Sequence, residues 1–121
     1  MSCDVPAGVG RYRGLEVRNA AGRGINLHEC ANVTVRNCSI HDIQCRALGG
    51  SGEKLLFEGN KVWNACLVNA DNAFVKAGKK GGWPATVQTS MRDDKRASTD
   101  VIFRNNEVRD SWGEGIDAWF L

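Results

Sequence analysis

The side chains best suited to chemistry in this 121-residue chain are its two histidines and a scattered set of carboxylates. Imidazole is the group that exchanges a proton near neutral pH, so His28 and His41 are the first candidates for acid–base work. Neither stands in a catalytic motif: there is no Gly-x-Ser-x-Gly elbow, no His-Glu-x-x-His pair, no phosphate-binding glycine loop and no EF-hand loop. Ordinary surface or corner positions are the simpler interpretation of both.

The cysteines do not form a metal or redox motif. There are five, an odd number, and none lies in a Cys-x-x-Cys pair, so at least one thiol stays free. We therefore expect no metal site and no cofactor, and we interpret the cysteines as small buried or half-buried side chains. They are Cys3, Cys30, Cys38, Cys45 and Cys66.

Charge and composition exclude several classes of partner. Sixteen basic and fourteen acidic side chains leave a formal charge of +2, too balanced to indicate a nucleic acid or an anionic membrane surface. No apolar run is long enough to cross a bilayer. Residues 1–6 lack a basic start followed by an apolar run, so no signal peptide is visible. The length predicts a single domain over residues 1–121.

The elements that position any site come from one repeated pattern. Residues 33–36 alternate between apolar and polar side chains, the period of a half-buried strand. The pattern returns in residues 55–62 and 100–110, and a weaker copy occupies residues 15–19. Leu55 follows Val33 by 22 positions, and a period near this length with Asn or Gly at the breaks indicates a coil of stacked strands.

The repeat register predicts which side chains stack inside the coil. Alternate apolar positions should face inward, and corner asparagines should form a ladder, either Asn60 with Asn106 or Asn37 with Asn105. Cys38 takes the place of Asn60 in its own repeat. The expected inward residues are Val33, Val35, Leu55, Phe57, Val101 and Phe103.

Over roughly residues 12–121 this pattern resembles the right-handed parallel β-helix repeat of the pectate-lyase-like superfamily. The resemblance implies an all-β fold of about four coils, either a minimal or a truncated solenoid, in an extracellular protein. Helix should be almost absent, and no capping helix is recognisable in residues 1–11, which we expect to be an irregular N-terminal segment. We expect strands at residues 15–19, 24–28, 32–36, 55–58, 101–104 and 115–119.

The third coil contains a long loop excursion over residues 69–99. Leu55 and Val101 are 46 positions apart, which leaves about 24 residues beyond one ordinary coil. Strict register places the missing strand at residues 68–71. The alternative uses residues 81–88 with Ala85 and Val87 inward, and the resemblance favours it because such coils often approach the strand through Gly-Gly-Trp.

Aligning the short apolar pairs of successive coils predicts a polar column on the outer face. Asn26, Gly49 and Asp117 fall outward one above another, and the third coil adds Thr86 and Gln88, or Asp71 under strict register. The next column contains His28, Ser51 and Trp119. The loop excursion contributes Trp83, whose face is suited to a sugar ring, and Arg92. The candidate substrate-binding residues are therefore Asn26, His28, Asp71, Trp83, Arg92 and Asp117.

Enzymes of the superfamily carry their catalytic groups on this outer face. Its lyases use calcium-binding aspartates with an arginine or lysine base, and its hydrolases use paired aspartates; neither set is found here in the family arrangement, so the catalytic residues are unknown. The favoured hypothesis is a non-catalytic β-helix module, carbohydrate-binding or structural. The alternative is a polysaccharide lyase-like or hydrolase-like enzyme with Asp117, His28 and Asp71 on its active face, or a fragment of a longer β-helix enzyme.

The last coil predicts self-association. A stack of strands exposes apolar side chains at its end, and here the chain closes on Trp119, Phe120 and Leu121. Burying each large side chain is favourable by roughly 1.5–3 kcal/mol. We expect a homodimer joined through the C-terminal coil with Trp119 and Phe120 at the interface; the alternative is a tail folded over its own last coil.

Overall fold

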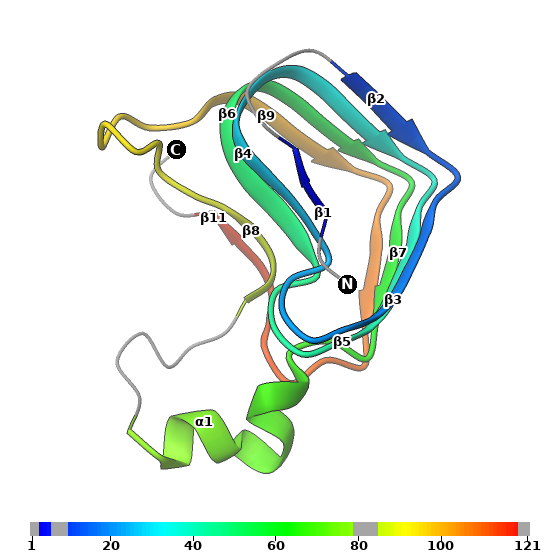
Figure 1. The fold of residues 1–121 in the computed structure, drawn as a ribbon, viewed down its shortest axis with the longest axis vertical. Coiled ribbons are helices and arrows are strands. Elements are labelled where there is room, and N and C mark those ends of the chain that lie inside the picture. Colours follow the sequence, from blue (N-terminus) through cyan, green and yellow to red (C-terminus); the bar gives the residue numbers. More distant parts are fainter. Residues whose placement is uncertain (1–2, 6–9, 79–84, 119–121) are drawn as a thin grey trace.

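The strands of the chain wind into a three-sided coil. The computed structural model describes residues 3–5, 10–78 and 85–118. Viewed down the stack, successive turns lie directly behind one another and enclose the interior (Figure 1). Every strand pair among the described residues is parallel. The expected all-β parallel β-helix is therefore confirmed.

The strands form three faces, which we call A, B and C. Face A is built from β1 (Cys3–Val5), the start of β4 (Ile25–Arg36), the start of β6 (Leu48–Glu58), β8 (Ala85–Thr89) and β11 (Glu114–Ala118). Face B contains β2 (Gly10–Arg13), the ends of β4 and β6, and β9 (Thr99–Arg104). Face C contains β3 (Glu16–Ala20), β5 (Ser39–Ile43), β7 (Lys61–Trp63) and β10 (Glu107–Arg109).

Each expected strand overlaps an observed one, although the pairs 24–28 and 32–36 merge into β4. That strand continues around the corner between faces A and B, and its pairing with β6 shifts register between Leu27 and Cys30. The alternation pattern missed the short strands of face C, because β7 and β10 span only three residues each. Three residues are too few to establish a period of two.

The expectation of an irregular segment over residues 1–11 is wrong for the described part of it. Cys3–Val5 forms β1 and pairs with Ile25–Leu27, and β2 begins at Gly10. Parallel pairing uses backbone N–H and C=O groups, which these residues supply whatever their side chains. An edge strand can therefore form without an apolar pattern.

The long third coil follows the second of the two placements. Val87 of β8 lies opposite Leu48 of β6, and Ile116 of β11 lies opposite Val87. Residues 68–71 instead belong to the 3₁₀ segment η1 (Leu67–Asn72), which leads into the single-turn helix α1 (Ala73–Lys76). In Figure 1 this helical segment projects from the corner between faces C and A.

A buried asparagine explains why strict register fails. Asn69 is 2% exposed, and its side-chain amide nitrogen donates to the carbonyl oxygen of Trp112 at 2.7 Å. Its amide oxygen accepts the backbone N–H of Phe74 at 3.0 Å. These bonds hold the segment as a turn against the coil, so residues 68–71 are not free to pair as a strand.

The interior is a stack of apolar side chains, as the register predicts. Val33, Val35, Leu55 and Phe57 are at most 1% exposed. Val101 and Phe103 continue the rows and are partly buried against the same core. The rings of Phe57 and Phe103 stack with centroids 4.7 Å apart and planes 11° from parallel. Stacking one coil on the next thus buries a surface that a lone coil would expose.

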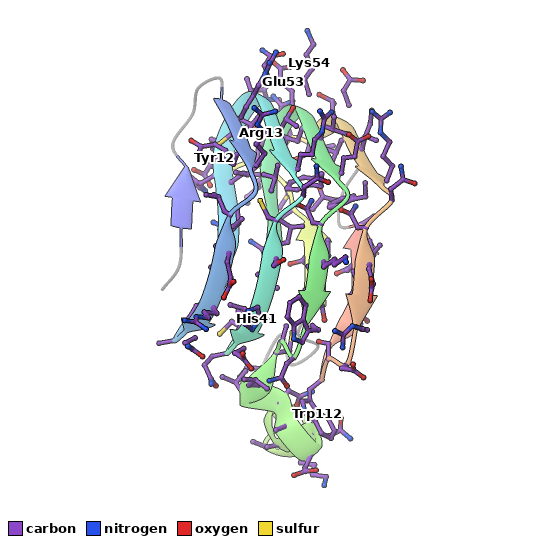
Figure 2. All side chains as sticks on the ribbon, turned by 90° about the vertical axis from the view of Figure 1, so that its right-hand side faces the viewer. Tyr12, Arg13, His41, Glu53, Lys54 and Trp112 are labelled. Carbon is purple, nitrogen blue, oxygen red and sulfur yellow. The ribbon has the colours of Figure 1, made fainter. Side chains whose placement is uncertain are left out.

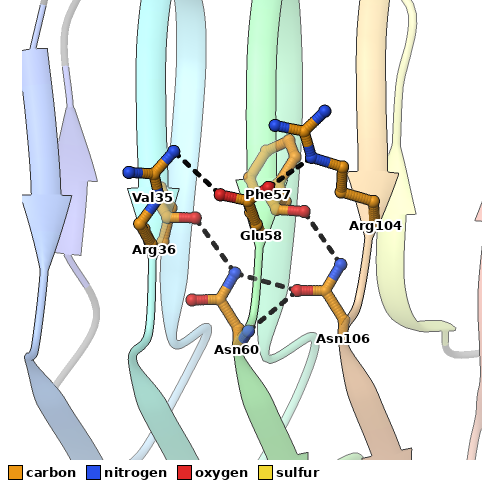
Figure 3. Close-up of polar contacts among 7 residues, drawn as sticks. All are labelled: Val35, Arg36, Phe57, Glu58, Asn60, Arg104 and Asn106. Carbon is orange, nitrogen blue, oxygen red and sulfur yellow. Dashed lines mark hydrogen bonds and ion pairs between the residues drawn. The ribbon is translucent and has the colours of Figure 1, made fainter.

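The corner between faces B and C carries the asparagine ladder. Asn60 Nδ2 donates to the Val35 carbonyl at 3.1 Å and to Asn106 Oδ1 at 3.0 Å, and Asn106 Nδ2 donates to the Phe57 carbonyl at 2.9 Å (Figure 3). Cys38 sits at the equivalent position and its N–H donates to Asn60 Oδ1 at 3.0 Å. Of the two expected ladders, Asn60 with Asn106 is the one that forms.

At each corner of the coil, one residue per turn adopts the left-handed backbone conformation. Glycine, asparagine and aspartate tolerate that conformation best, because a short polar side chain bonds locally and glycine has no Cβ. Asp42 and Asp110, at matching positions of the repeat, are such corner residues, with φ values of 56° and 50°. Among the described residues three left-handed series recur from turn to turn: Gly14, Asn37, Gly59 and Asn105; Asn19, Asp42, Asn64 and Asp110; and Asn32, Lys54 and Asp100.

Candidate functional site

The predicted polar column exists on the outer side of face A. Asn26 lies opposite Gly49, Gly49 opposite Gln88, and Gln88 opposite Asp117. Parallel strands place these positions about 4.8 Å apart along the stack. The column therefore presents an amide, a gap at the glycine, a second amide and a carboxylate.

The gap is bridged by a side chain from the preceding turn. Arg46 Nη1 donates to Gln88 Oε1 at 2.7 Å, and Arg46 Nη2 donates to Asn26 Oδ1. Gln88 Nε2 in turn donates to Asp117 Oδ2 at 2.8 Å. Four side chains from four successive turns are thus joined in one hydrogen-bonded row, which we call the polar row.

Gly49 makes this arrangement possible. Its φ of 151° is a conformation that side-chain-bearing residues rarely adopt, and a Cβ there would stand 1.8 Å from the carbonyl oxygen of Gln88. In the sequence, the glycine-rich run 49–52 is typical of a flexible corner. It is instead the start of strand β6, buried between β4 and β8. Glycine is needed here for close backbone approach.

Arg46 is a half-buried cation. Desolvation, with a smaller contribution from the positive charge of Arg23, lowers the pKa of its guanidinium to about 10. The group is still protonated at neutral pH. Its Nε is buried and has no hydrogen-bond partner among the described residues. A partly desolvated guanidinium binds an anionic or hydroxyl oxygen more strongly than one in water.

The polar row forms one wall of an open pocket of about 600 Å³. Cationic, anionic and amide side chains all face it, with a smaller apolar contribution from Leu27 and Met91. The lining residues are Arg23, Asn26, Leu27, His28, Arg46, Ser51, Gln88, Ser90, Met91, Asp93, Glu114 and Asp117.

The opposite wall is the loop of residues 90–98 between β8 and β9. The loop is pinned to β6 at both ends: the Ser90 N–H donates to the Gly50 carbonyl at 3.0 Å, and the Gly52 N–H donates to Ser98 Oγ at 3.0 Å. Ser98 Oγ also donates to the Ser90 carbonyl at 2.5 Å, which closes the base of the loop. The loop in Figure 1 extends from the corner where β4 and β6 bend.

His28 connects that loop to the sheet. Its Nε2 lies 2.9 Å from Asp93 Oδ2, and the Asp93 N–H donates to Glu29 Oε1 at 2.5 Å. Both side chains remain more than half exposed, at 55% and 72%. The pair therefore borders the pocket while its polar edges stay accessible to a ligand.

Of the predicted site residues, the structure brings Asn26, His28 and Asp117 together in the pocket. Asp71 lies apart from it, exposed in η1 with a φ of 57°. Arg92 is also outside the lining: its Nη2 donates to Thr99 Oγ1 at 3.0 Å and lies 3.9 Å from Glu53. Trp83 lies outside the described residues.

Sequence reasoning missed four lining residues with charged side chains, one of which, Asp93, lies in the loop of residues 90–98. Arg46 and Arg23 precede their strands, where the alternation pattern assigns no face, and Glu114 stands at the start of β11. A signal for Arg46 was present: the column has a glycine at Gly49, so a long side chain has room to reach across. The register alone does not say which residue does so.

The described residues contain no group of three or more His, Cys, Asp or Glu side chains that could hold a metal ion. Burial raises the pKa of the thiols of Cys30, Cys38 and Cys66, so they are less reactive than exposed cysteines. Among the described residues no helix has the length and apolar character needed to span a membrane.

Comparison with known proteins supports the architecture. The family model described as "right handed beta helix region" matches residues 7–118, almost the full length of the chain. No curated protein matches the chain, and no solved structure does. The parallel three-faced coil, the stacked interior and this match lead to one conclusion: the chain belongs to the right-handed β-helix family.

Proposed function

We propose that the chain is a carbohydrate-binding β-helix module that holds a sugar chain in the pocket on face A. The observation that carries the proposal is the polar row, in which the Arg46 guanidinium is fixed between Asn26 and Gln88 beside an open pocket. Ligand sites of this kind are concave and contain a few polar groups in fixed positions.

The chemistry of the pocket suits a ligand rich in hydroxyl groups. Each sugar hydroxyl donates one hydrogen bond and accepts others, so it pairs with both amides and charged groups. Asp117 supplies an acceptor, Arg46 supplies donors, and Gln88 supplies both. Because the row is already hydrogen-bonded, little side-chain freedom is lost when a ligand binds.

Isothermal titration with a panel of neutral and acidic oligosaccharides tests this proposal. His28→Ala and Asp117→Asn remove groups at the two sides of the pocket without disturbing a buried side chain. We expect each to weaken binding by about tenfold, the effect of losing one hydrogen bond to a charged group. Asp110→Asn is the matched control, since it changes a carboxylate at an exposed left-handed corner that asparagine accepts.

The proposal fails if no oligosaccharide binds, or if binding occurs and neither pocket variant weakens it relative to Asp110→Asn. Arg46→Met is a further variant, because methionine keeps part of the buried stem and removes the guanidinium. It leaves Asn26 and Gln88 without their shared donor. A circular dichroism spectrum and an unfolding curve for this variant separate a lost ligand contact from a lost fold.

A polysaccharide lyase-like or hydrolase-like enzyme is the second candidate. The observation in its favour is that the carboxylates of Asp117 and Glu114 line the same pocket as the half-buried guanidinium of Arg46. Carboxylates near a cation are the usual groups for acid–base work on a sugar chain. The chain would then release unsaturated or reducing ends from a polysaccharide, and Asp117→Asn would abolish the release.

A further inference from the structure

A second polar surface lies on the outer side of face B, on a different side of the coil from the polar row. The parallel pairing of β2 with β4 places Arg11 opposite Thr34 and Arg13 opposite Arg36. Alternation puts these four side chains on the same side of the sheet. They border a pocket of about 480 Å³, together with Tyr12. Figure 2 shows Tyr12 and Arg13 on β2, at the N-terminal side of the stack.

This surface carries more arginine side chains than carboxylates that could pair with them. Arg13, Arg36, Glu58 and Arg104 follow one another across the face in register. Glu58 is shared: Arg36 Nη2 lies 2.8 Å from its Oε1, and Arg104 Nε bonds to its Oε2 (Figure 3). The hydrogen bond from Arg104, helped by both positive charges, lowers the pKa of the Glu58 carboxyl. Both oxygens of the Glu58 carboxylate are therefore already paired with arginine side chains.

Arg11 and Arg13 have no ion-pair partner among the described residues, and both are exposed. None of the side chains lining the pocket is acidic. Like charges placed directly opposite each other on neighbouring strands destabilise a sheet. The Nε of Arg36 is moreover buried and has no hydrogen-bond partner within the described part of the chain. An anion between the guanidinium groups would relieve both conditions.

We propose that Arg11, Arg13 and Arg36 form a binding site for a tetrahedral oxyanion, a phosphate or sulfate group. Guanidinium forks match such groups through paired, charge-assisted hydrogen bonds. The Thr34 hydroxyl, opposite Arg11, adds a neutral donor. Glu58 fixes Arg36 from the side away from β2, so one of the three cations is oriented before the ligand arrives. The site is independent of the pocket on face A and of the function proposed for it.

The experiment measures binding of inorganic phosphate and inorganic sulfate by isothermal titration at low ionic strength, with chloride as the reference anion. Dextran sulfate and unmodified dextran form a second arm, which separates a free ion from a sulfate ester on a polymer. The test variant is Arg11→Gln with Arg13→Gln. Its charge-matched control is Arg18→Gln with Arg109→Gln on face C, where the two arginines pair with Glu16 and with Glu107 and Asp110.

We expect phosphate, sulfate or the sulfated polymer to bind the wild-type chain, with affinity falling as sodium chloride is added. The face B double variant should bind at least tenfold more weakly, and the face C control should bind as the wild type does. Because Arg11 and Arg13 are exposed and replacing Arg13 removes its repulsion with Arg36, the face B variant should unfold at no lower a temperature than the wild type. Equal weakening in the two double variants, or binding no tighter than that of chloride, overturns the site.

Discussion

The amide oxygen of Asn106 accepts two hydrogen bonds from Asn60 in the preceding turn, one from its backbone N–H and one from its side chain, both at 3.0 Å. The two residues are 46 positions apart in the chain yet occupy the same corner of successive turns. This contact ties the turns on either side of the long excursion together, so the coil stays in register across it.

Asn60→Ala should destabilise the fold by about 2–5 kcal/mol. The side chain is fully buried, and its removal leaves the Cys38 N–H and the Val35 carbonyl without their partners. Each unsatisfied buried group costs about 1–3 kcal/mol. Urea denaturation measures the change. Asn105→Gly is the control, since that exposed corner has a φ of 54° and glycine accepts it; equal loss in both variants would contradict the role given to the ladder.

Val35→Asp should prevent folding. Val35 is 0% exposed in the interior stack, and an unpaired carboxylate there costs at least about 3 kcal/mol, a large part of the stability of a small domain. Thr34→Asp places the same group on the outer side of the same strand. Circular dichroism should show strand structure for the Thr34 variant and its loss for the Val35 variant, and a folded Val35→Asp protein would show that the inward register is wrong.

Limited trypsin digestion should cut the loop of residues 90–98 before the coils. Lys95 and Arg96 are exposed in a turn, whereas Arg36 and Arg104 lie in paired strands that must open before a protease can bind them. Arg92 should be cut more slowly than Lys95, since its side chain is 12% exposed and bonded to Thr99. Mass spectrometry of the first fragments identifies the order of cleavage. Lys79 and Lys80, where the sequence also predicts early cleavage, lie outside the described residues.

Stability should fall in acid partly through Asp42. Its carboxylate accepts a hydrogen bond from His41 Nδ1 at 2.6 Å and another from Asn64 Nδ2 at 2.5 Å, and these contacts lower its pKa below the ordinary 3.8. A depressed folded-state pKa stabilises the fold above the unfolded value, and the contribution disappears as the pH falls through the folded value. The loss therefore occurs below about pH 4.

Asp42→Asn tests this assignment, because asparagine accepts the left-handed corner and does not titrate. Urea midpoints between pH 7 and pH 2.5 should decline less steeply for this variant than for the wild type. If the urea midpoints of the two proteins decline equally as the pH falls, Asp42 does not contribute to the loss of stability in acid.

We propose that the chain forms a homodimer through its C-terminal coil. Ile116 and Ile102 are 56% and 48% exposed, and Phe103 is only partly covered, so the last described turn presents apolar surface. Trp119 and Phe120, expected at the interface, lie outside the described residues. Sedimentation equilibrium at micromolar concentration should give a dimer that Phe120→Glu and Ile116→Glu dissociate. A monomer whose mass neither change affects would leave the proposal without support.

The architecture could be predicted from sequence because its determinants are local and repeated. The alternation around Val35 and the 22-residue spacing from Val33 to Leu55 specify which side chains stack, and corner residues such as Asp42 mark the breaks. Residues of the candidate site could be predicted only where they lie on strands. Asn26 and Asp117 follow from register, whereas Arg46 reaches the column from a turn and Asp93 from a loop, and neither position has a period to extrapolate.

The closed base of the loop over residues 90–98 has a consequence for how binding preference could diversify. Ser98 joins the two ends of the loop to each other and to Gly52, so the strands on either side are held whatever the loop contains. The segment between Ser90 and Ser98 can therefore change in length and composition while the coil keeps its shape. One wall of the pocket can thus be altered without changing the coil. This loop is therefore the part of the chain where substitutions should change ligand specificity and leave the fold intact.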